Sequence, residues 1–180
     1  MAMSSRLYFA YGLNMNRTEF GRKCSRSVAL KPARLPGYRL AYYEYTPVWD
    51  GGMETIIPDE TAEIWGVLYQ VDEADWEELD RSEDARMDGT GAYFHYPVEV
   101  VDENQTAIAA LVYLKARWGQ KAVPGQEYMA LVIEGAKNHG LPESYIQTLQ
   151  EFETKPAAYP VPRRPKTSRF ECDDNCSGCV

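Results

Sequence analysis

The order of its predicted elements is what most constrains the fold of this chain. Segments with the alternating or continuous apolar pattern of β-strands fill the first two thirds of the 180 residues, and amphipathic helical segments fill most of the last third. A doubly wound α/β fold would instead alternate strands with helices along the chain. The order therefore favours a mixed or antiparallel sheet, and such a sheet can close into a barrel.

Turn residues mark the ends of the predicted strands. Pro58 ends a short strand, and the turn Asp-Glu-Asn-Gln joins the last two strands as a hairpin. Pro97 lies inside the first strand of that hairpin, so we expect this strand at an edge of the sheet or at a bulge. The predicted strands are residues 6–11, 37–46, 53–58, 62–71, 92–101 and 106–114.

Two helices are predicted from capping residues and apolar spacing. Asp72 is a candidate N-cap for residues 72–80, with Asp75 in the position of a capping-box partner. A second helix, residues 125–139, has one apolar face and can end at Gly140 in the left-handed conformation.

The end of the chain contains one more helix and then changes character. Pro142 fits the first position of a final amphipathic helix. Beyond it the sequence becomes rich in proline, which is typical of an extended segment on a surface. We therefore expect a single domain at residues 1–155 and a C-terminal tail at residues 156–180.

The composition is that of a soluble globular protein with an acidic surplus. Nineteen basic and 27 acidic residues give a net charge of −8, which argues against nucleic acid or an anionic membrane as the main partner. No stretch is long and apolar enough for a membrane span, and the first residues lack the pattern of a signal peptide. We expect a cytoplasmic monomer or homodimer whose four cysteines are thiols.

The segment YFAYGLNMN contains the first candidate site. An apolar strand runs into Gly12, where the lack of a Cβ atom lets the backbone approach a ligand. The backbone N–H groups of Leu13, Asn14 and Met15 follow in a turn, and consecutive amides of this kind can bind a carboxylate or a phosphate. The alternative is structural: Gly12 serves a tight turn, and Asn14 caps a short helix at residues 16–23.

The acidic stretch that begins at residue 72 contains the second candidate. If its helix continues past Asp80, Glu83 shares the apolar face with Trp76 and Leu79. Burial near a pocket would raise the pKa of such a carboxyl group toward the range useful for proton transfer. If the helix stops at Asp80 instead, Glu83 is exposed.

Other polar motifs give weaker indications. The turn Trp-Asp-Gly-Gly at residues 49–52 either approaches a ligand or only joins two strands. His95 and His139 are far apart and lack metal-ligand spacing, so we interpret both as structural. No nucleophile elbow, dinucleotide fingerprint, P-loop or zinc-protease helix is present, which argues against those classes of enzyme.

The cysteines fall into two groups. Cys24 stands alone and is expected to be buried packing. The last residues either provide a weak metal site of three thiolates or form an unstructured, redox-sensitive tail. The cysteines of this group are Cys172, Cys176 and Cys179.

Six segments, in order, resemble motifs of the γ-glutamyl cyclotransferase family. YFAYGLNMN is similar to that family's Tyr-Phe-Ala-Tyr-Gly-Ser-Asn-Leu, WDGGMETII to its Gly-Gly-x-Ala-Thr-Ile, and EIWGVLYQV to its Val-Trp-Gly-Val strand. LDRSEDA resembles Leu-Asp-x-x-Glu-Gly, and GAYFHYPVEV and GAKNHGLPESY resemble the two motifs that follow. The resemblance extends over most of the chain, from about residue 7 to residue 153.

The resemblance implies an α+β fold and a reaction. The fold is a small mixed or antiparallel β-barrel flanked by helices, with the ligand cavity at one mouth. Members of the family convert a γ-glutamyl compound into 5-oxoproline and a free amine, without a cofactor or a metal. By this resemblance Glu83 is the catalytic base and acid, and the turn after the first strand holds the substrate's α-carboxylate. The expected substrate-binding residues are Tyr11, Gly12, Leu13, Asn14, Met15, Gly52, Tyr93 and Tyr128, the last two also as candidate oxyanion donors.

Three residues depart from the family's motifs. Leu13 replaces a serine, Glu54 replaces an alanine, and Asp84 replaces the glycine that follows the catalytic glutamate. These departures bear on the substrate more than on the reaction. The released amine could be an amino acid, the side chain of lysine, or a biosynthetic intermediate that carries a γ-glutamyl protecting group.

A function of a different class remains as an alternative. A non-catalytic binding module on the same barrel would keep the amide turn and lose the catalytic carboxylate. Glu83, in its Leu-Asp-x-x-Glu setting, is therefore the residue that favours an enzyme.

Overall fold

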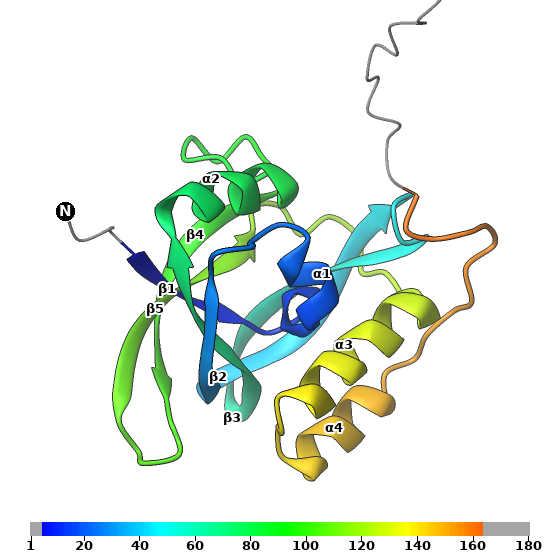
Figure 1. Cartoon of the computed structure of the whole chain (residues 1–180). Coiled ribbons are helices and arrows are strands. Elements are labelled where there is room, and N and C mark those ends of the chain that lie inside the picture. The colour runs from blue at the N-terminus through cyan, green and yellow to red at the C-terminus, as the bar shows by residue number, and fades with distance from the viewer. Residues whose placement is uncertain (1–4, 164–180) are drawn as a thin grey trace, which may run out of the picture.

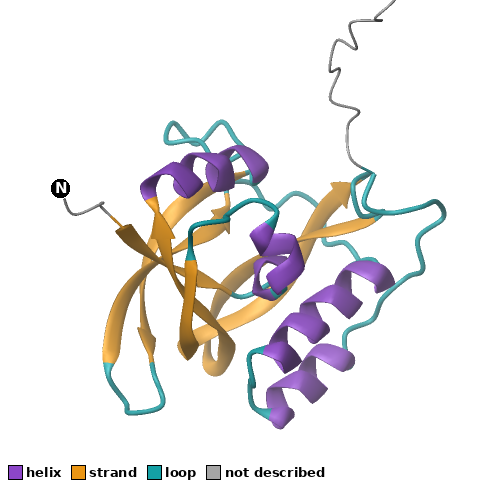
Figure 2. Cartoon of the chain, viewed as in Figure 1, coloured by secondary structure: helices purple, strands orange, loops and turns teal. Residues whose placement is uncertain are grey.

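The computed structural model describes residues 5–163, and its centre is a closed barrel of five strands (Figures 1 and 2). The strands hydrogen-bond in the order β1-β3-β2-β4-β5, and β1 closes the barrel by a parallel contact with β5. All other neighbours pair antiparallel. This confirms the predicted α+β fold with a mixed barrel. The strands are β1 (Ser5–Ala10), β2 (Val28–Thr46), β3 (Gly51–Asp72), β4 (Tyr93–Val101) and β5 (Ala107–Lys115).

Helices cover the barrel from two sides. In Figure 1, α3 and α4 lie side by side, and α2 lies over the opposite part of the barrel, near β4. The short helices η1 and α1 follow β1 directly and contact each other. The helices are η1 (Leu13–Met15), α1 (Arg17–Gly21), α2 (Glu73–Ser82), α3 (Gln126–Asn138) and α4 (Glu143–Gln150).

The long hairpin of β2 and β3 corrects the predicted strand boundaries. The segments 53–58 and 62–71 belong to the single strand β3, and β2 begins at Val28, well before the predicted start at residue 37. Pro58 does not end its strand; it pairs with Tyr38, beside a shift in register. A proline has no N–H to donate, and the register shift accommodates this, so the hydrogen-bonded pairing of β2 and β3 continues on both sides of Pro58.

The second hairpin agrees with its prediction. β4 and β5 pair antiparallel from Tyr93↔Lys115 to Val101↔Ala107. On its other side β4 pairs with β2 only through Val101. Pro97 therefore lies along a mostly open edge of β4, where a missing N–H leaves no ladder bond unmade.

The N-terminal end of α2 confirms one of its two capping predictions and not the other. Asp72 is the N-cap, and its carboxylate accepts from the N–H of Ala74 at 3.0 Å. Asp75 does not complete a capping box; it accepts from the N–H of Arg26 at 2.7 Å and from the hydroxyl of Ser27 at 2.8 Å. Asp75 thus holds the segment that precedes β2 against α2, and it does not cap the helix.

The C-terminal helices agree closely with their prediction. Gly140 follows α3 with a φ of +68°, the left-handed conformation that glycine adopts without strain. Pro142 is the N-cap of α4 rather than its first helical residue. Beyond α4, the N–H of Ala158 donates to Asp50 at 2.7 Å, and the N–H of Arg163 donates to the carbonyl of Val48 at 2.7 Å. The described part of the tail therefore lies along the domain.

Two other expectations concern the cysteines and the absence of a membrane span. Cys172, Cys176 and Cys179 lie outside the described residues, whereas Cys24 is buried as expected. Between residues 5 and 163 no helix is both long enough and apolar enough to span a bilayer.

Gly135 allows α3 to pack against the turn that follows β1. A Cβ atom at this position would lie 2.6 Å from the backbone N of Asn16 and 2.6 Å from the carbonyl carbon of Met15. We expect Gly135→Ala to lower the free energy of unfolding by about 1–3 kcal/mol, measured in urea, because backbone rather than a flexible side chain must move. Gly21→Ala is the matched control, since open space surrounds Gly21. Equal stabilities of the two variants would contradict this packing account.

Candidate functional site

The turn after β1 takes the form of one turn of 3-10 helix. The N–H of Met15 donates to the carbonyl of Gly12 at 2.9 Å, and that of Asn16 donates to Leu13 at 2.9 Å. The amide of Met15 is therefore engaged inside the turn, and its side chain is fully buried, which corrects the expectation that it faces a ligand. The amide of Leu13 does face a cavity, as described below.

Asn16, and not Asn14, caps the short helix that follows this turn. Asn16 caps α1, because its side-chain oxygen accepts from the N–H groups of Thr18 at 3.1 Å and Glu19 at 3.2 Å. Asn14 caps no helix. Its amide nitrogen instead donates to Glu83 Oε1 at 3.1 Å and its side chain is buried. The structural alternative for this turn thus applies to Asn16 and not to Asn14.

Glu83 lies on the inner side of α2, in the position that a continued helix predicts. The helix runs to Ser82, and the N–H of Glu83 donates to the carbonyl of Leu79 at 3.0 Å. The side chain of Glu83 is only 17% exposed. Asp80 points elsewhere and contacts His95 and the hydroxyl of Tyr113, both at 2.6 Å.

Lys23 provides the counter-charge to Glu83. Its Nζ lies 2.8 Å from Glu83 Oε1 and donates to Asn14 Oδ1 at 3.0 Å. Burial by itself lowers the pKa of Lys23, but the charge and hydrogen bond of Glu83 outweigh burial and leave that pKa above its ordinary value. Lys23 therefore stays an ammonium group. Lys23, Asn14 and Glu83 form a connected polar cluster that we call the Glu83 cluster.

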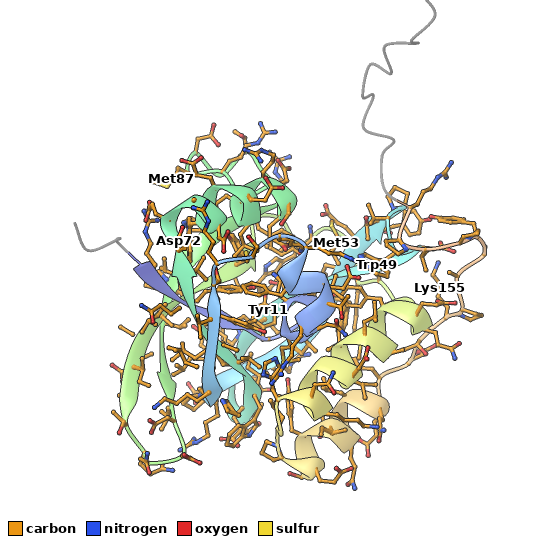
Figure 3. All side chains as sticks on the ribbon, in the orientation of Figure 1. Tyr11, Trp49, Met53, Asp72, Met87 and Lys155 are labelled. Carbon is orange, nitrogen blue, oxygen red and sulfur yellow. The ribbon has the colours of Figure 1, made fainter. Side chains whose placement is uncertain are left out.

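A cavity of about 230 Å³ joins the Glu83 cluster to the turn after β1. Of the predicted site residues it brings together Leu13, Gly52, Glu83, Tyr93 and Tyr128. Gly52 comes from the glycine-rich turn, which therefore does approach the cavity. Trp49 and Met53, both labelled in Figure 3, complete the wall on this side.

The other predicted binding residues lie behind the cavity wall. Tyr11, labelled in Figure 3, is buried, and its hydroxyl donates to the backbone carbonyl of Tyr113. Gly12 lies beneath the side chain of Glu54, as described next, and Asn14 acts through its contacts with Glu83. These residues support the site rather than line it.

Glu54 occupies the place that the sequence assigns to a bound carboxylate. Its Oε2 accepts from the backbone N–H of Leu13 at 3.2 Å and from the hydroxyl of Tyr128. Its backbone carbonyl accepts from the hydroxyl of Tyr93 at 2.7 Å. A Cβ atom on Gly12 would lie 1.7 Å from Glu54 Oε2, so only glycine lets this carboxylate rest on the turn.

The surroundings of Glu54 favour its neutral form. Burial raises the pKa of Glu54 most, the hydrogen bond from Tyr128 opposes that rise, and the negative charge of Glu83 adds to it. The resulting pKa is about 7. Burial first, and then the charge of Glu54, raises the pKa of both Tyr93 and Tyr128 well above the ordinary value, so both hydroxyls remain donors.

A larger hollow of about 380 Å³ lies between β2, residues 121–124 and the end of α4. Its charged side chains, which include Arg39, Lys121 and Glu151, are exposed to water. We therefore place the candidate chemistry in the smaller cavity, where the carboxylates are held by specific donors. In the part of the chain that the structure describes, no cluster of three or more His, Cys, Asp or Glu side chains is arranged to hold a metal ion.

Sequence reasoning missed Lys23 and did not place Glu54 in the site. Position 54 carried a usable signal, because it precedes the fully buried Ile56 by two residues and so shares its face of β3. Lys23 lies two residues beyond a five-residue helix, where no periodicity predicts the direction of a side chain.

Comparisons with known proteins show which proteins this chain resembles. The model of the AIG2-like family matches residues 63–149. The γ-glutamylcyclotransferases of Mus musculus and Homo sapiens are each 28% identical over 151 residues, which cover 82% of this chain and 78% of each relative. A solved structure of a γ-glutamyl cyclotransferase superposes with a TM-score of 0.81 at 26% identity and covers 88% of this chain and 94% of that one.

The sequence and structural similarities each cover more than four fifths of this chain, so they overlap over most of it. The superposition also covers 94% of the solved structure's chain. The motifs that carry the resemblance include the turn after β1, the glycine-rich turn and the end of α2, and the structure brings all three to one cavity. Over most of its length the chain is similar in sequence and in fold to γ-glutamyl cyclotransferases.

Proposed function

We propose that this protein cyclises a γ-glutamyl group and releases the amine attached to it. The α-amino nitrogen attacks the γ-carbonyl carbon, a five-membered lactam forms, and the γ-amide C–N bond breaks. Glu83 is the residue that carries the protons. The single observation that most supports this proposal is the Glu83 carboxylate, largely buried, fixed through one oxygen and lining the same cavity as the Leu13 amide.

The contacts of Glu83 leave one of its oxygens for the substrate. Lys23 and Asn14 both bind Oε1. Among the hydrogen bonds of residues 5–163, none is made to Oε2. The first oxygen thus fixes the orientation of the carboxylate, and the second can accept a proton from the substrate's α-ammonium group.

The protons balance within the reaction. The α-nitrogen begins as an ammonium with three protons and ends as a lactam N–H with one. The departing nitrogen begins as an amide N–H and ends as an ammonium, so it gains the two protons that the α-nitrogen loses. One carboxylate can relay each proton in turn because both nitrogens are bonded to the same carbon in the intermediate.

Much of the rate gain should come from holding the substrate in a ring-closing conformation, since the reaction is intramolecular. The developing oxyanion still needs a donor. Tyr93 and Tyr128 already donate to Glu54 in this structure. Lys23 has three N–H protons and uses two of them, on Glu83 and Asn14, so its third proton is the better candidate for the γ-carbonyl oxygen.

The direct test is a panel of γ-glutamyl amines that includes γ-glutamyl-alanine and γ-glutamyl-ε-lysine. Mass spectrometry would detect the lactam and the released amine, and an enzyme-free sample would measure spontaneous cyclisation. Formation of lactam above that background supports the proposal. Binding of these compounds without any lactam would instead identify a binding module on the same barrel.

Lys23→Met should lower kcat by about 10²-fold with a smaller change in KM, because it removes the charge beside Glu83 and the proposed oxyanion donor. Lys23→Arg should recover part of that loss, since a guanidinium keeps the charge but not the geometry. Steady-state kinetics on the best substrate of the panel would measure both. Wild-type kcat in Lys23→Met would exclude Lys23 from the chemistry.

A further inference from the structure

The turn after β1 already holds a carboxylate, and that carboxylate belongs to the protein. Glu54 Oε2 receives both the Leu13 N–H, at 3.2 Å, and the Tyr128 hydroxyl. Its carboxylate lies against Gly12, where an added Cβ would be 1.7 Å from Oε2 and 2.4 Å from Oε1. A substrate carboxylate cannot use the same N–H group while Glu54 is there.

The backbone of β3 holds Glu54 in this position. Glu54 pairs with Tyr42 in the β2–β3 ladder, and its carbonyl accepts from the hydroxyl of Tyr93 at 2.7 Å. The next residue, Thr55, is fully buried and its hydroxyl accepts from the N–H of Lys115 at 3.2 Å. The strand therefore fixes the point from which the side chain reaches the turn.

The charges around the cavity disfavour a further carboxylate. Lys23, Glu54 and Glu83 are its inward charged groups and sum to −1 when both glutamates are ionised. Asp84 also lines the cavity, but its side chain is 54% exposed and pairs with Arg86. A free γ-glutamyl compound would add an α-carboxylate next to two carboxylates, and the same compound with that group amidated would add only its α-ammonium charge.

We infer that Glu54 is a specificity-determining residue, which makes the site select γ-glutamyl compounds whose α-carboxyl group is an amide rather than a free carboxylate. This inference rests on the proposed function. The amide supplies an N–H group that can donate to Glu54, whereas a carboxylate would be repelled by the ionised form of Glu54. The selected class is thus a glutamyl unit with an amide on both carbonyl groups and a free α-amine.

The chemistry is unchanged for this class of substrate. The α-nitrogen forms a bond to the γ-carbonyl carbon, the γ-amide C–N bond breaks, and the two protons lost by the α-ammonium end on the released amine. The α-amide is not cleaved. The product is the amide of 5-oxoproline rather than 5-oxoproline itself.

The test compares two substrates that differ only at the α-carboxyl group: γ-glutamyl-alanine, and the same compound with the glutamyl α-carboxyl group as a primary amide. Both release alanine, which gives one readout for both, and enzyme-free samples correct for spontaneous cyclisation. For the wild-type protein we expect kcat/KM to be higher for the α-amide by about 10-fold or more. Glu54→Ala should move this ratio toward the free acid by about 10-fold or more, because it frees the Leu13 amide and removes a charge.

Glu54→Gln keeps the shape of the side chain and should move the ratio in the same direction by a smaller amount, so it carries the test if Glu54→Ala does not fold. A wild-type preference for the free acid, or a ratio that neither variant changes, would overturn the inference while the cyclisation itself stands. Release of alanine from neither substrate would instead overturn the proposed function, and the inference with it.

Discussion

Replacing Glu83 by glutamine should lower kcat for release of the amine by about 10²–10⁴-fold while the protein remains folded. Glutamine keeps the length and planarity of the side chain and can still accept from Lys23 through its oxygen. It cannot take a proton from the α-ammonium group at neutral pH. The expected signature is therefore a loss in kcat with retained binding of the substrate, measured by steady-state kinetics and by calorimetry.

Glu77→Gln is the matched control for this variant. Glu77 lies on the same helix, α2, but is exposed on its outer side. The two substitutions make the same chemical change, and only one of them faces the cavity. Wild-type turnover by Glu83→Gln, or an equal loss in both variants, would remove Glu83 from the mechanism.

Glu54→Gln should stabilise the fold relative to the wild type by about 3 kcal/mol at pH 8 and by less than about 1 kcal/mol at pH 5. The folded protein raises the pKa of Glu54 from 4.5 to about 7, chiefly by burial. Between these values the unfolded chain loses the proton and the folded protein keeps it, so the stability of the wild type falls as the pH rises from about 4.5 to 7. Glutamine does not titrate, so the variant does not lose this stability as the pH rises.

Urea unfolding at the two pH values measures this difference. Glu99→Gln is the control, because Glu99 is an exposed glutamate in a strand of the same barrel. It makes the same chemical change outside the cavity and so measures the effect of the substitution itself. A stability difference for Glu54→Gln that is the same at pH 5 and pH 8 would contradict the raised pKa and the confined position of this carboxylate.

Much of the fold could be predicted because local patterns and tertiary structure agree. The hairpin of β4 and β5 follows from two alternating segments around a polar turn, and Gly140 marks the end of α3. The boundaries of β2 and β3 could not be predicted in the same way. Pro58 normally ends a strand, but here a register shift in the long hairpin accommodates it, and only the pairing with Tyr38 reveals this.

The part of the site that could be predicted from the sequence is the part that helical periodicity places. If the helix continues past Asp80, a glutamate seven residues after Trp76 shares its apolar face, and the structure shows Glu83 largely buried there. The contacts of Asn14 depend on a partner 69 residues away, so neighbouring residues could not show that it binds Glu83 rather than capping a helix. Lys23 lies outside any periodic segment, and its pairing with Glu83 is purely tertiary.

Glu54 shows how one position can change what a shared site does. The turn that follows β1 supplies a backbone donor suited to an anion, and here a side chain of the protein takes that donor. Under the proposed function, Glu54 acts on the substrate-binding part of the cavity, whereas proton transfer belongs to the Glu83 cluster. Substrate preference and proton transfer can be tested separately for this reason.

The central claim is that the substrate's own α-nitrogen, and not water, breaks the γ-amide bond. Turnover of a γ-glutamyl amine in water labelled with heavy oxygen tests this most directly, with the products read by mass spectrometry. We expect a lactam that contains no heavy oxygen and an equal amount of released amine, formed by the wild type and not by Glu83→Gln. Glutamate or its α-amide carrying one heavy oxygen would show hydrolysis and would contradict the account.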